Sequence, residues 1–327
     1  MSKADRDNIK IFSGRASRDL TQSICQYLEL PIGQGKTEVF PDGELLVKID
    51  EDVRGRDCFV VQSTTHPANA NLMELLIYID CLRRASADRI TAVIPYYGYA
   101  RQDRKDEGRT PITAKLVANL ITTAGAHRVL AMDLHAAQIQ GFFDIPVDAL
   151  SASPVLINHF AEIKKTCGAC TMVSPDVGNA KMAAAFADAL GLDLAIIDKR
   201  RESGTDVVAT HIIGDVAGKT AFMVDDMIST GGTICEAAAL LKERGATDVI
   251  AACTHPVFVG LAMERLADAP ISSVIATDTI PAGSRCSPIE DKLTILTVAE
   301  LIGEAIHRIH HNRSVSDLFK KGAGGKR

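Results

Sequence analysis

Short apolar runs rich in valine and isoleucine recur along this chain, separated by longer segments whose apolar residues have a helical spacing. A strand that is buried on both faces reads as a continuous apolar run, and parallel strands need a crossover connection, usually a helix. The alternation therefore predicts an α/β fold of mainly parallel sheets flanked by helices. We expect strands at 58–61, 90–94, 129–132, 171–173, 194–197, 221–224, 249–253 and 274–276.

The segments between these runs are the expected helices, and the residues at their ends fit that interpretation. Pro111 suits a first helical position, whereas Gly125, Gly191 and Gly245 stand where a left-handed residue would end a helix. The expected helices are 71–84, 111–124, 179–190, 233–244 and 261–267.

The length of 327 residues exceeds one average domain of roughly 100–200 residues, so we expect two domains. Small and turn-forming residues near 149–154 mark the boundary, which gives domains at 1–150 and 151–304. A last helix at 298–311 could pack on either half, and the C-terminal helix, at about 305–320, could pack on the first domain. The glycine- and lysine-rich end at 321–327 is expected to be disordered.

The composition excludes several classes of protein. A net charge of -5 argues against a protein that coats nucleic acid, so a local positive site must hold any anionic ligand. The start is too polar for a signal peptide, and no apolar run reaches the ~18 residues of a membrane span. These features predict a cytoplasmic protein with no membrane partner. The eight cysteines then read as reduced core residues, and the Cys167 and Cys170 pair lacks further ligands for a metal.

The residues after the expected strand 221–224 are unusually polar and precede a helix. Ligands of an open parallel sheet gather at the carboxyl ends of its strands. The glycines let the backbone approach a ligand, the amides at the helix start form an anion site, and the two carboxylates can accept hydrogen bonds from sugar hydroxyls. A simple strand-to-helix turn does not explain two adjacent acids, so we expect a ribose phosphate here. The stretch reads Asp225, Asp226, Met227, Ile228, Ser229, Thr230, Gly231, Gly232 and Thr233.

A second phosphate motif fails on its spacing. Gly35, Lys36 and Thr37 match the end of a nucleotide-binding P-loop, but Leu30 stands where that motif requires its first glycine. We therefore interpret the triplet as a solvated turn.

The stretch 224–233 resembles the ribose 5-phosphate loop that phosphoribosyltransferases share with the ribose-phosphate diphosphokinases. Two further segments resemble only the diphosphokinases of class I. They are 40–44, which reads Phe-Pro-Asp-Gly-Glu, and 96–115, and the resemblance continues through 132–148 to cover nearly the whole chain. It implies two tandem phosphoribosyltransferase-like domains. It also implies that the pyrophosphate of ATP is transferred to ribose 5-phosphate, giving phosphoribosyl pyrophosphate for nucleotide biosynthesis.

The resemblance implies that two segments bind ATP. Phe40 offers an aromatic face to the purine, although a lone Phe is also common in a core. Asp42 and Glu44 can accept hydrogen bonds from the nucleotide. The segment 101–109 is either an exposed mobile loop or a lid over the triphosphate, which also needs mobility. The residues implied to bind ATP are Phe40, Asp42, Gly43, Glu44, Arg101 and Gln102.

Acidic and basic residues follow three other expected strands. Magnesium prefers oxygen ligands and keeps several waters, and the resemblance implies that His135 and Asp176, with Asp133, hold Mg²⁺. Lys199 and Arg201 match the catalytic pair of the family, and the resemblance implies that Arg201 also serves the ribose 5-phosphate site. On spacing alone they could belong to a solvated loop, but fixed cations around a transferring phosphate stabilise its charge.

Two other functions stay open. A phosphoribosyltransferase activity would explain the loop at 225–233 but would not account for the segments 40–44 and 96–115. A non-catalytic regulatory relative would keep the fold, and the presence of His135, Lys199 and Arg201 argues against it.

The chain departs from the common family pattern at two positions, Ser229, where an Asp is usual, and Asp52, which replaces a Ser of the regulatory phosphate pocket. The remaining residues of that pocket are present as Arg54, Ser86, Ser314 and Ser316. A carboxylate at short range repels phosphate by about 1 kcal/mol or more, so we expect weakened activation by phosphate. The resemblance also implies a homo-oligomer, a hexamer.

Overall fold

The computed structural model describes residues 8–105, 107–201, 208–316 and 318, with the backbone alone described at 199–201 and 208–210. The described residues form two compact units. The first is assembled from three stretches that lie within 1–151, 279–281 and 297–321, and the second lies within 152–278 and 282–296. The chain therefore leaves the first unit after Ser151 and returns to it twice.

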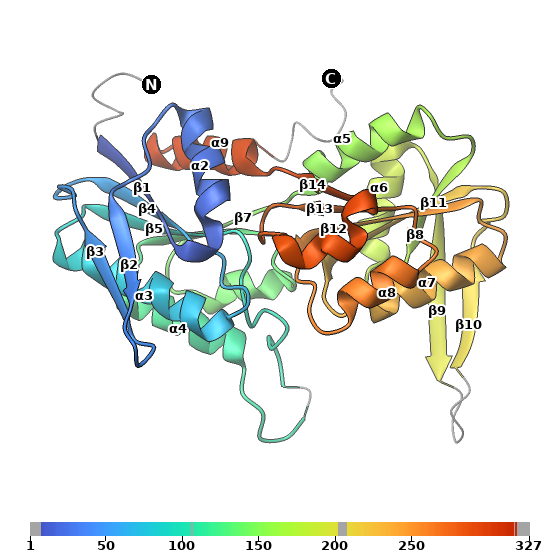
Figure 1. The fold of residues 1–327 in the computed structure, drawn as a ribbon, viewed down its shortest axis with the longest axis horizontal. Coiled ribbons are helices and arrows are strands. Elements are labelled where there is room, and N and C mark those ends of the chain that lie inside the picture. Colours follow the sequence, from blue (N-terminus) through green and yellow to red (C-terminus); the bar gives the residue numbers. More distant parts are fainter. Residues whose placement is uncertain (1–7, 106, 202–207, 317, 319–327) are drawn as a thin grey trace. The chain divides into compact units, whose positions relative to one another are not determined.

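The first unit holds a five-stranded sheet with the order β1-β4-β5-β6-β7, in which every pairing is parallel (Figure 1). A separate antiparallel hairpin of β2 (Gly35–Val39) and β3 (Leu45–Ile49) follows the first strand and helix. The five strands are β1 (Ile9–Ser13), β4 (Asp57–Val61), β5 (Arg89–Ile94), β6 (Arg128–Met132) and β7 (Val147–Leu150).

Helices cover both faces of this sheet, which is why β4 is buried along its whole length. Side chains of α3 (Ala68–Arg84) and α4 (Thr113–Ala124) share one core with alternate residues of the strands, such as Cys58 and Val60. On the other side α2 (Arg18–Leu28), which also contacts β1, packs against α9 (Ala299–His310). A Cβ at Gly303 would come within 2.6 Å of the Tyr27 ring, so this close helix packing requires glycine.

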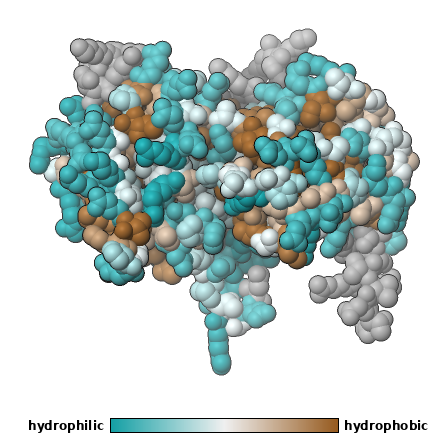
Figure 2. Space-filling view, viewed as in Figure 1, coloured by the Kyte–Doolittle hydropathy of each residue, from teal (hydrophilic) through white to brown (hydrophobic). Residues whose placement is uncertain are grey.

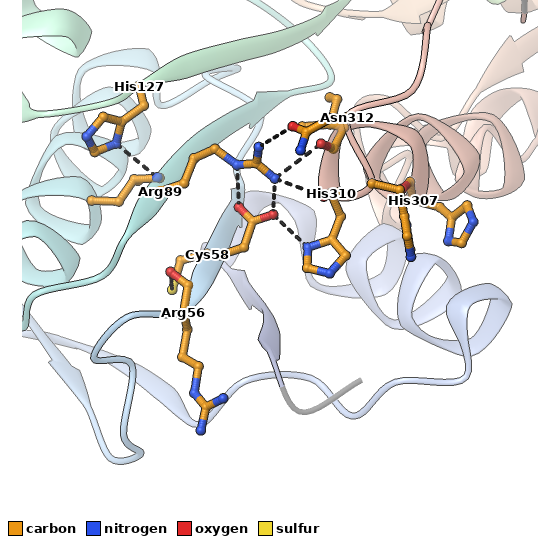
Figure 3. A network of polar contacts seen from close by, with 11 residues as sticks. Arg56, Cys58, Arg89, His127, His307, His310 and Asn312 are labelled. Carbon is orange, nitrogen blue, oxygen red and sulfur yellow. Dashed lines mark hydrogen bonds and ion pairs between the residues drawn. The ribbon is translucent and has the colours of Figure 1, made fainter. Parts of the chain in front are cut away.

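A network of polar contacts fixes the end of α9 to the starts of β4 and β5 (Figure 3). The buried carboxylate of Asp57 accepts hydrogen bonds from the guanidinium of Arg89 and contacts the ring of His310. Arg89 also donates to the carbonyl of Ile309 at 3.1 Å and to the side chain of Asn312 at 3.2 Å. The C-terminal helix is thereby part of the first unit.

The second unit holds a seven-stranded sheet with the order β10-β9-β8-β11-β12-β13-β14. All its pairings are parallel except that of β9 with the edge strand β10. The strands are β8 (Cys170–Ser174), β9 (Asp193–Arg201), β10 (Val208–Ile213), β11 (Thr220–Ile228), β12 (Asp248–Pro256), β13 (Ser273–Thr277) and β14 (Leu293–Leu296).

Alternate residues of β11 point to different helices, which makes this unit a three-layer structure. Phe222 and Val224 pack with side chains of α5 (Ser153–Lys164) and α6 (Ala180–Leu190). Ala221 and Met223 pack with α7 (Gly232–Glu243) and α8 (Ala262–Asp268). The two units also contain the short 3₁₀ helices Arg15–Ser17, Ala137–Phe142 and Ser284–Lys292.

The α/β class and the parallel sheets flanked by helices are confirmed, and each expected strand and helix is present. Gly125, Gly191 and Gly245 have the left-handed φ angles expected after a helix. Several local predictions, including the ends of β9 and β12, were wrong. Gly35 to Thr37 form the strand β2 rather than a turn, Pro111 precedes α4, and β11 continues past Val224 to Ile228. The C-terminal helix ends at His310, and residues 311–316 of the segment expected at 305–320 are not helical. Residues 317, 319–320 and the tail at 321–327 lie outside the described residues.

The face in Figure 2 is mostly hydrophilic, and its apolar side chains gather in separate small groups. Among the described residues, no helix combines the length and the apolar character that crossing a bilayer would require.

Candidate active site

The strand β11 carries the start of the polar stretch that is expected to bind a ribose phosphate. Asp225 pairs in register with Cys253 of β12, so both acids extend the strand instead of beginning a loop. On the other side of β11 the pairing with β8 stops at Met223. Asp225 and Asp226 therefore lie just past the end of β8, at the carboxyl edge of the sheet.

Asp225 lies in an environment that disfavours negative charge. Burial, followed by the neighbouring charge of Asp226, raises the pKa of Asp225 to about 8. One Asp225 oxygen accepts a hydrogen bond from the amide of Asp226 at 2.8 Å, which partly offsets that effect. A hydrogen-bonding ligand or a cation at this position would relieve the repulsion.

The turn after β8 brings a third acid to the same place. Asn179 donates from its side chain to the carbonyl of Val224, and its amide donates to the carboxylate of Asp176 at 2.9 Å. The hydroxyl of Ser174 also donates to the backbone of Asp176, at 2.6 Å. The charge of Asp176 contributes to the raised pKa of Asp225, as expected of neighbours.

The loop after β11 presents unpaired amides at the start of α7. Gly231 has a φ of 76°, a conformation that favours glycine, and its carbonyl accepts from Cys235 inside the helix. Within the described part of the chain, no acceptor pairs with the backbone N–H groups of Gly231, Gly232, Thr233 and Ile234. These groups, with the positive end of the helix dipole, form a site suited to a phosphate.

The segments expected to bind ATP belong to the first unit. Residues 40–44 form the exposed tip of the β2–β3 hairpin, where Gly43 has a φ of 91° and Asp42 accepts from the amide of Glu44 at 3.1 Å. Phe40 is 43% exposed, so it is not a core residue. A flat aromatic face on a tip of this kind is available for stacking.

Arg101 and Gln102 lie between β5 and α4, and both are exposed. The Gln102 carbonyl accepts from the amide of Ala114, and its side chain contacts the hydroxyl of Thr113 at 2.5 Å. Gln102 is thus anchored at the start of α4. Among the described residues, no hydrogen bond or ion pair joins the hairpin tip to Arg101 or Gln102.

The three residues expected to hold a metal are divided between the units. Asp133 and His135 follow β6 in the first unit, where Asp133 has a positive φ of 36° and its amide donates to the carbonyl of Leu150. Asp176 belongs to the second unit. Across the described residues, no group of three or more His, Cys, Asp or Glu side chains is arranged to hold a metal ion.

Lys199 and Arg201 lie in the last part of β9, whose expected end was at 197. Lys199 pairs with Thr210 and Arg201 with Val208 in the antiparallel ladder to β10. Their side chains lie outside the described part of the chain.

The four residues of the expected regulatory pocket lie on three segments of the first unit. The amide of Gly55 donates to the carbonyl of Ser86 at 2.9 Å, which joins the turns that carry Arg54 and Ser86. Asp52 accepts from the amide of Arg54 at 3.1 Å. The carbonyl of Ser314 accepts from Arg308 of α9 at 2.9 Å, and Ser316 is exposed.

A cavity of about 710 Å³ in the first unit lies apart from these segments. Its lining includes Arg15, Arg18, Lys36 and Tyr78, and it contains none of the expected site residues. Arg15 contacts the buried Glu74, and Lys36 lies 3.0 Å from Asp50, so two of its three cations have acidic partners. The Gly35 to Thr37 triplet lines this cavity as part of a strand.

Two contributors to the second-unit site were missed by the sequence analysis. Asn179 precedes α6 at a helix-start position, and that position was a signal for a residue with a side chain near the sheet edge. Arg265 donates from Nη1 to the carbonyl of Thr230 at 3.0 Å. It lies in the middle of a predicted helix, and no local pattern distinguishes it from a solvent-exposed cation.

Two family models match the chain. One describes the N-terminal domain of ribose phosphate pyrophosphokinase and matches residues 9–125, and the other describes a phosphoribosyl synthetase-associated domain and matches residues 205–320.

Full-length relatives carry the same description. A ribose-phosphate pyrophosphokinase of Rhodopirellula baltica is 58% identical, covering 96% of this chain and 99% of the relative. One from Gloeobacter violaceus is 53% identical, with coverages of 96% and 94%. The crystal structure of phosphoribosylpyrophosphate synthetase from Mycobacterium smegmatis matches with a TM-score of 0.88 at 44% identity, covering 93% of this chain and 99% of that one. With two family models, full-length relatives and a solved structure in agreement, this chain belongs to the ribose-phosphate pyrophosphokinase family.

Proposed function

We propose that this chain transfers the pyrophosphate of MgATP to the anomeric hydroxyl of ribose 5-phosphate, giving 5-phosphoribosyl 1-pyrophosphate and AMP. The full-length relatives described as ribose-phosphate pyrophosphokinases support the reaction, and the structural observation that carries the ribose 5-phosphate site is the combination on β11 and α7. Carboxylates that can bind vicinal hydroxyls lie directly before a glycine loop with unpaired amides that can bind a phosphate. Phosphate and hydroxyl recognition at this spacing suits a ribose phosphate.

In this proposal the amides and hydroxyls of the loop hold the 5-phosphate, while Asp225 and Asp226 accept hydrogen bonds from the ribose hydroxyls. Ionised carboxylates accept such bonds better than protonated ones, so sugar binding is expected to favour the charged form of Asp225. The loop consists of Ser229, Thr230, Gly231, Gly232 and Thr233. Ser229 keeps a hydroxyl that can donate to the phosphate where an Asp would add negative charge.

The donor nucleotide is proposed to bind through the first unit. The exposed ring of Phe40 supports purine stacking, and Asp42, Gly43 and Glu44 form the hairpin turn beside it. Arg101 is exposed on the segment before α4 and is assigned to the triphosphate, together with the anchored Gln102.

We assign Mg²⁺ binding to His135, Asp176 and Asp133, with ATP oxygens and waters as the remaining ligands. The carboxylates of Asp133 and Asp176 are oxygen donors of the kind that magnesium prefers, and the raised pKa of Asp225 near Asp176 fits a position that favours a cation. When bound, the ion neutralises charge on the ATP phosphates.

The proposed step is an in-line displacement. The anomeric oxygen forms a bond to the β-phosphorus, the bond between that phosphorus and the bridging oxygen of the α-phosphate breaks, and AMP leaves as the hydroxyl proton is released. Lys199 and Arg201 stabilise the charge of the transferring group, and the loop 225–233 holds the nucleophile in line. No covalent enzyme intermediate is required.

A homo-oligomer, a hexamer by family resemblance, and a cytoplasmic location complete the proposal. Arg54, Ser86, Ser314 and Ser316 are proposed to form a regulatory phosphate site. The hydrogen bond between Gly55 and Ser86 supports the proximity of two of these segments.

A coupled assay tests the reaction. Purified protein with Mg²⁺, ATP and inorganic phosphate is expected to release AMP only when ribose 5-phosphate is added, with phosphoribosyl pyrophosphate detected by its use in a phosphoribosyltransferase reaction. No AMP release under these conditions would exclude the synthase activity. Consumption of phosphoribosyl pyrophosphate with a nucleobase would instead identify a phosphoribosyltransferase.

A further inference from the structure

The loop before α7 is held by the segment that follows β12. The amide of Phe258 donates to the carbonyl of Ile228, and the amide of Val259 donates to that of Ser229, both at 3.0 Å. The first turn of α8 lies directly beside the glycines, because a Cβ built on Gly231 would be 3.6 Å from the backbone of Ala262. This segment therefore fixes the loop up to Ser229 through the backbone and borders the next two residues.

The following peptide group is anchored by a side chain. Nη1 of Arg265, an exposed residue of α8, donates to the Thr230 carbonyl at 3.0 Å. In a trans peptide the carbonyl and the next N–H point in opposite directions. The bond that turns the Thr230 carbonyl toward Arg265 therefore turns the N–H of Gly231 away from it.

Glycine makes that anchor necessary. Gly231 has a φ of 76° and no Cβ, so the Thr230–Gly231 peptide meets little steric resistance to rotation. A rotated peptide would present a carbonyl oxygen where the N–H had been, and a carbonyl repels a phosphate that the N–H would attract. The remaining amides of Gly232, Thr233 and Ile234 are fixed by the start of α7.

We propose that Arg265 is a positioning residue for ribose 5-phosphate, because it holds the Thr230–Gly231 peptide with its N–H available to the 5-phosphate. The inference rests on the proposed function and gives a role in ligand binding to Arg265, which lies outside the loop itself. Since Arg265 is exposed, its bond contributes little to the stability of the unit. Loss of this hydrogen bond is therefore expected to weaken ribose 5-phosphate binding without unfolding the unit.

Three variants at this position distinguish the hydrogen bond from charge. Arg265→Ala removes both, Arg265→Gln keeps a donor without charge, and Arg265→Lys keeps the charge. Lys242→Ala is a matched control, because Lys242 is an exposed cation that donates to the Thr247 carbonyl at 2.8 Å near the other end of α7. Steady-state kinetics give KM for each substrate, and calorimetry gives ribose 5-phosphate binding without turnover.

We expect Arg265→Ala to raise KM and Kd for ribose 5-phosphate about tenfold, the equivalent of one hydrogen bond to a charged group. KM for ATP and the unfolding midpoint should stay near those of the wild type, and Arg265→Gln should recover most of the loss. Lys242→Ala should change none of these values.

Two results would overturn the inference. One is an unchanged Kd for ribose 5-phosphate in Arg265→Ala, and the other is recovery by Arg265→Lys but not by Arg265→Gln, which would assign the effect to charge. A wild-type protein that binds ribose 5-phosphate but releases no AMP would contradict the proposed function alone.

Discussion

Oδ2 of Asp57 lies 2.8 Å from Nδ1 of His310, which joins the first residue of β4 to the last residue of α9 across most of the chain. Arg89 donates to the same carboxylate, from Nε at 2.9 Å. Burial raises the pKa of Asp57, but the hydrogen bonds from Arg89 and His310 outweigh it and hold that pKa below its usual value. The ionised carboxylate is therefore the form that the first unit stabilises.

Asp57→Asn is expected to lower the free energy of unfolding by about 1.5–3 kcal/mol, because Arg89 and His310 lose a charged acceptor. The folded-state pKa is depressed, so this contribution is present above the unfolded pKa and is lost as pH falls through the folded one. Urea unfolding near neutral pH measures it. Asp80→Asn is the control, since it removes an exposed ion pair to Arg84, and exposed ion pairs contribute little to stability. Equal losses in the two variants would contradict the prediction.

Asp225→Asn is expected to stabilise the second unit at alkaline pH. The folded pKa of about 8 lies above the unfolded value near 3.8, so the wild type loses stability as pH rises between the two. Asparagine does not ionise, so the free energy of unfolding of the variant should exceed that of the wild type by an amount that grows from pH 5 to pH 8.5. Thermal unfolding with a chelator present measures this difference.

The exposed acid Asp215 provides a control, because its pKa is shifted in the opposite direction from that of Asp225. Hydrogen bonds from the Ala217 amide and from Lys219 lower the pKa of Asp215. Asp215→Asn should give no stabilisation that grows with pH. A pH-independent difference between wild type and Asp225→Asn would show that Asp225 is ionised throughout. The variant should also bind ribose 5-phosphate more weakly, as a lost carboxylate acceptor requires.

The two adjacent glycines are expected to respond differently to alanine. Gly231→Ala should destabilise the protein by about 1–2 kcal/mol, because an L residue is strained at its φ of 76°. Gly232 has no positive φ, and a Cβ there would meet its nearest neighbour, Arg265, at 3.5 Å, an ordinary contact. Gly232→Ala should therefore leave the unfolding midpoint unchanged and raise KM for ribose 5-phosphate. An unchanged KM would show that the phosphate does not approach this residue.

Lys199→Ala is expected to reduce kcat on the order of 10² or more while leaving the unfolding curve nearly unchanged. In the proposed mechanism this variant loses a cation that stabilises the charge of the transferring group. Lys181→Ala, an exposed lysine of α6, is the control for removing a cation from the same unit. Near-full turnover in Lys199→Ala would contradict the proposed role.

Asp52→Ser is expected to strengthen activation by inorganic phosphate. The Asp52 carboxylate accepts from the amide of Arg54 and keeps a negative charge in the turn that carries this cation. The measurement is initial rate against phosphate concentration for both proteins. A steep activation curve in the wild type, unchanged by the substitution, would count against the prediction.

The sequence predicted the fold where apolar pattern alone decides structure, as in the buried strands around Val60 and Phe222. It placed the end of β11 at Val224 because two acids follow, whereas pairing of Asp225 and Met227 with β12 extends the strand. Tertiary pairing of this kind outweighs local polarity. The helix α2 was missed despite the i, i+4 spacing of its buried Leu20, Ile24 and Leu28.

The residues of the candidate site could be predicted from the sequence where they are consecutive in the chain, but not where folding brings them together. Residues in the chain motif 225–233 could be found from their order, because the motif is continuous. Arg265 could not, since its relation to Thr230 arises when α8 folds beside the loop. The grouping of Asp176 with Asp225 likewise depends on the Asn179 contact to β11.

The return of the chain to its first unit has a consequence for biosynthesis. During translation at about 5–20 residues per second, the strands that need α9 emerge well before it, and the intervening second unit takes roughly ten seconds to synthesise. Until then Asp57 and Arg89 lack His310 and Asn312, and α2 lacks the helix that covers it. Nascent chains halted before residue 299 should therefore carry an incomplete N-terminal half that is sensitive to protease and requires chaperone protection.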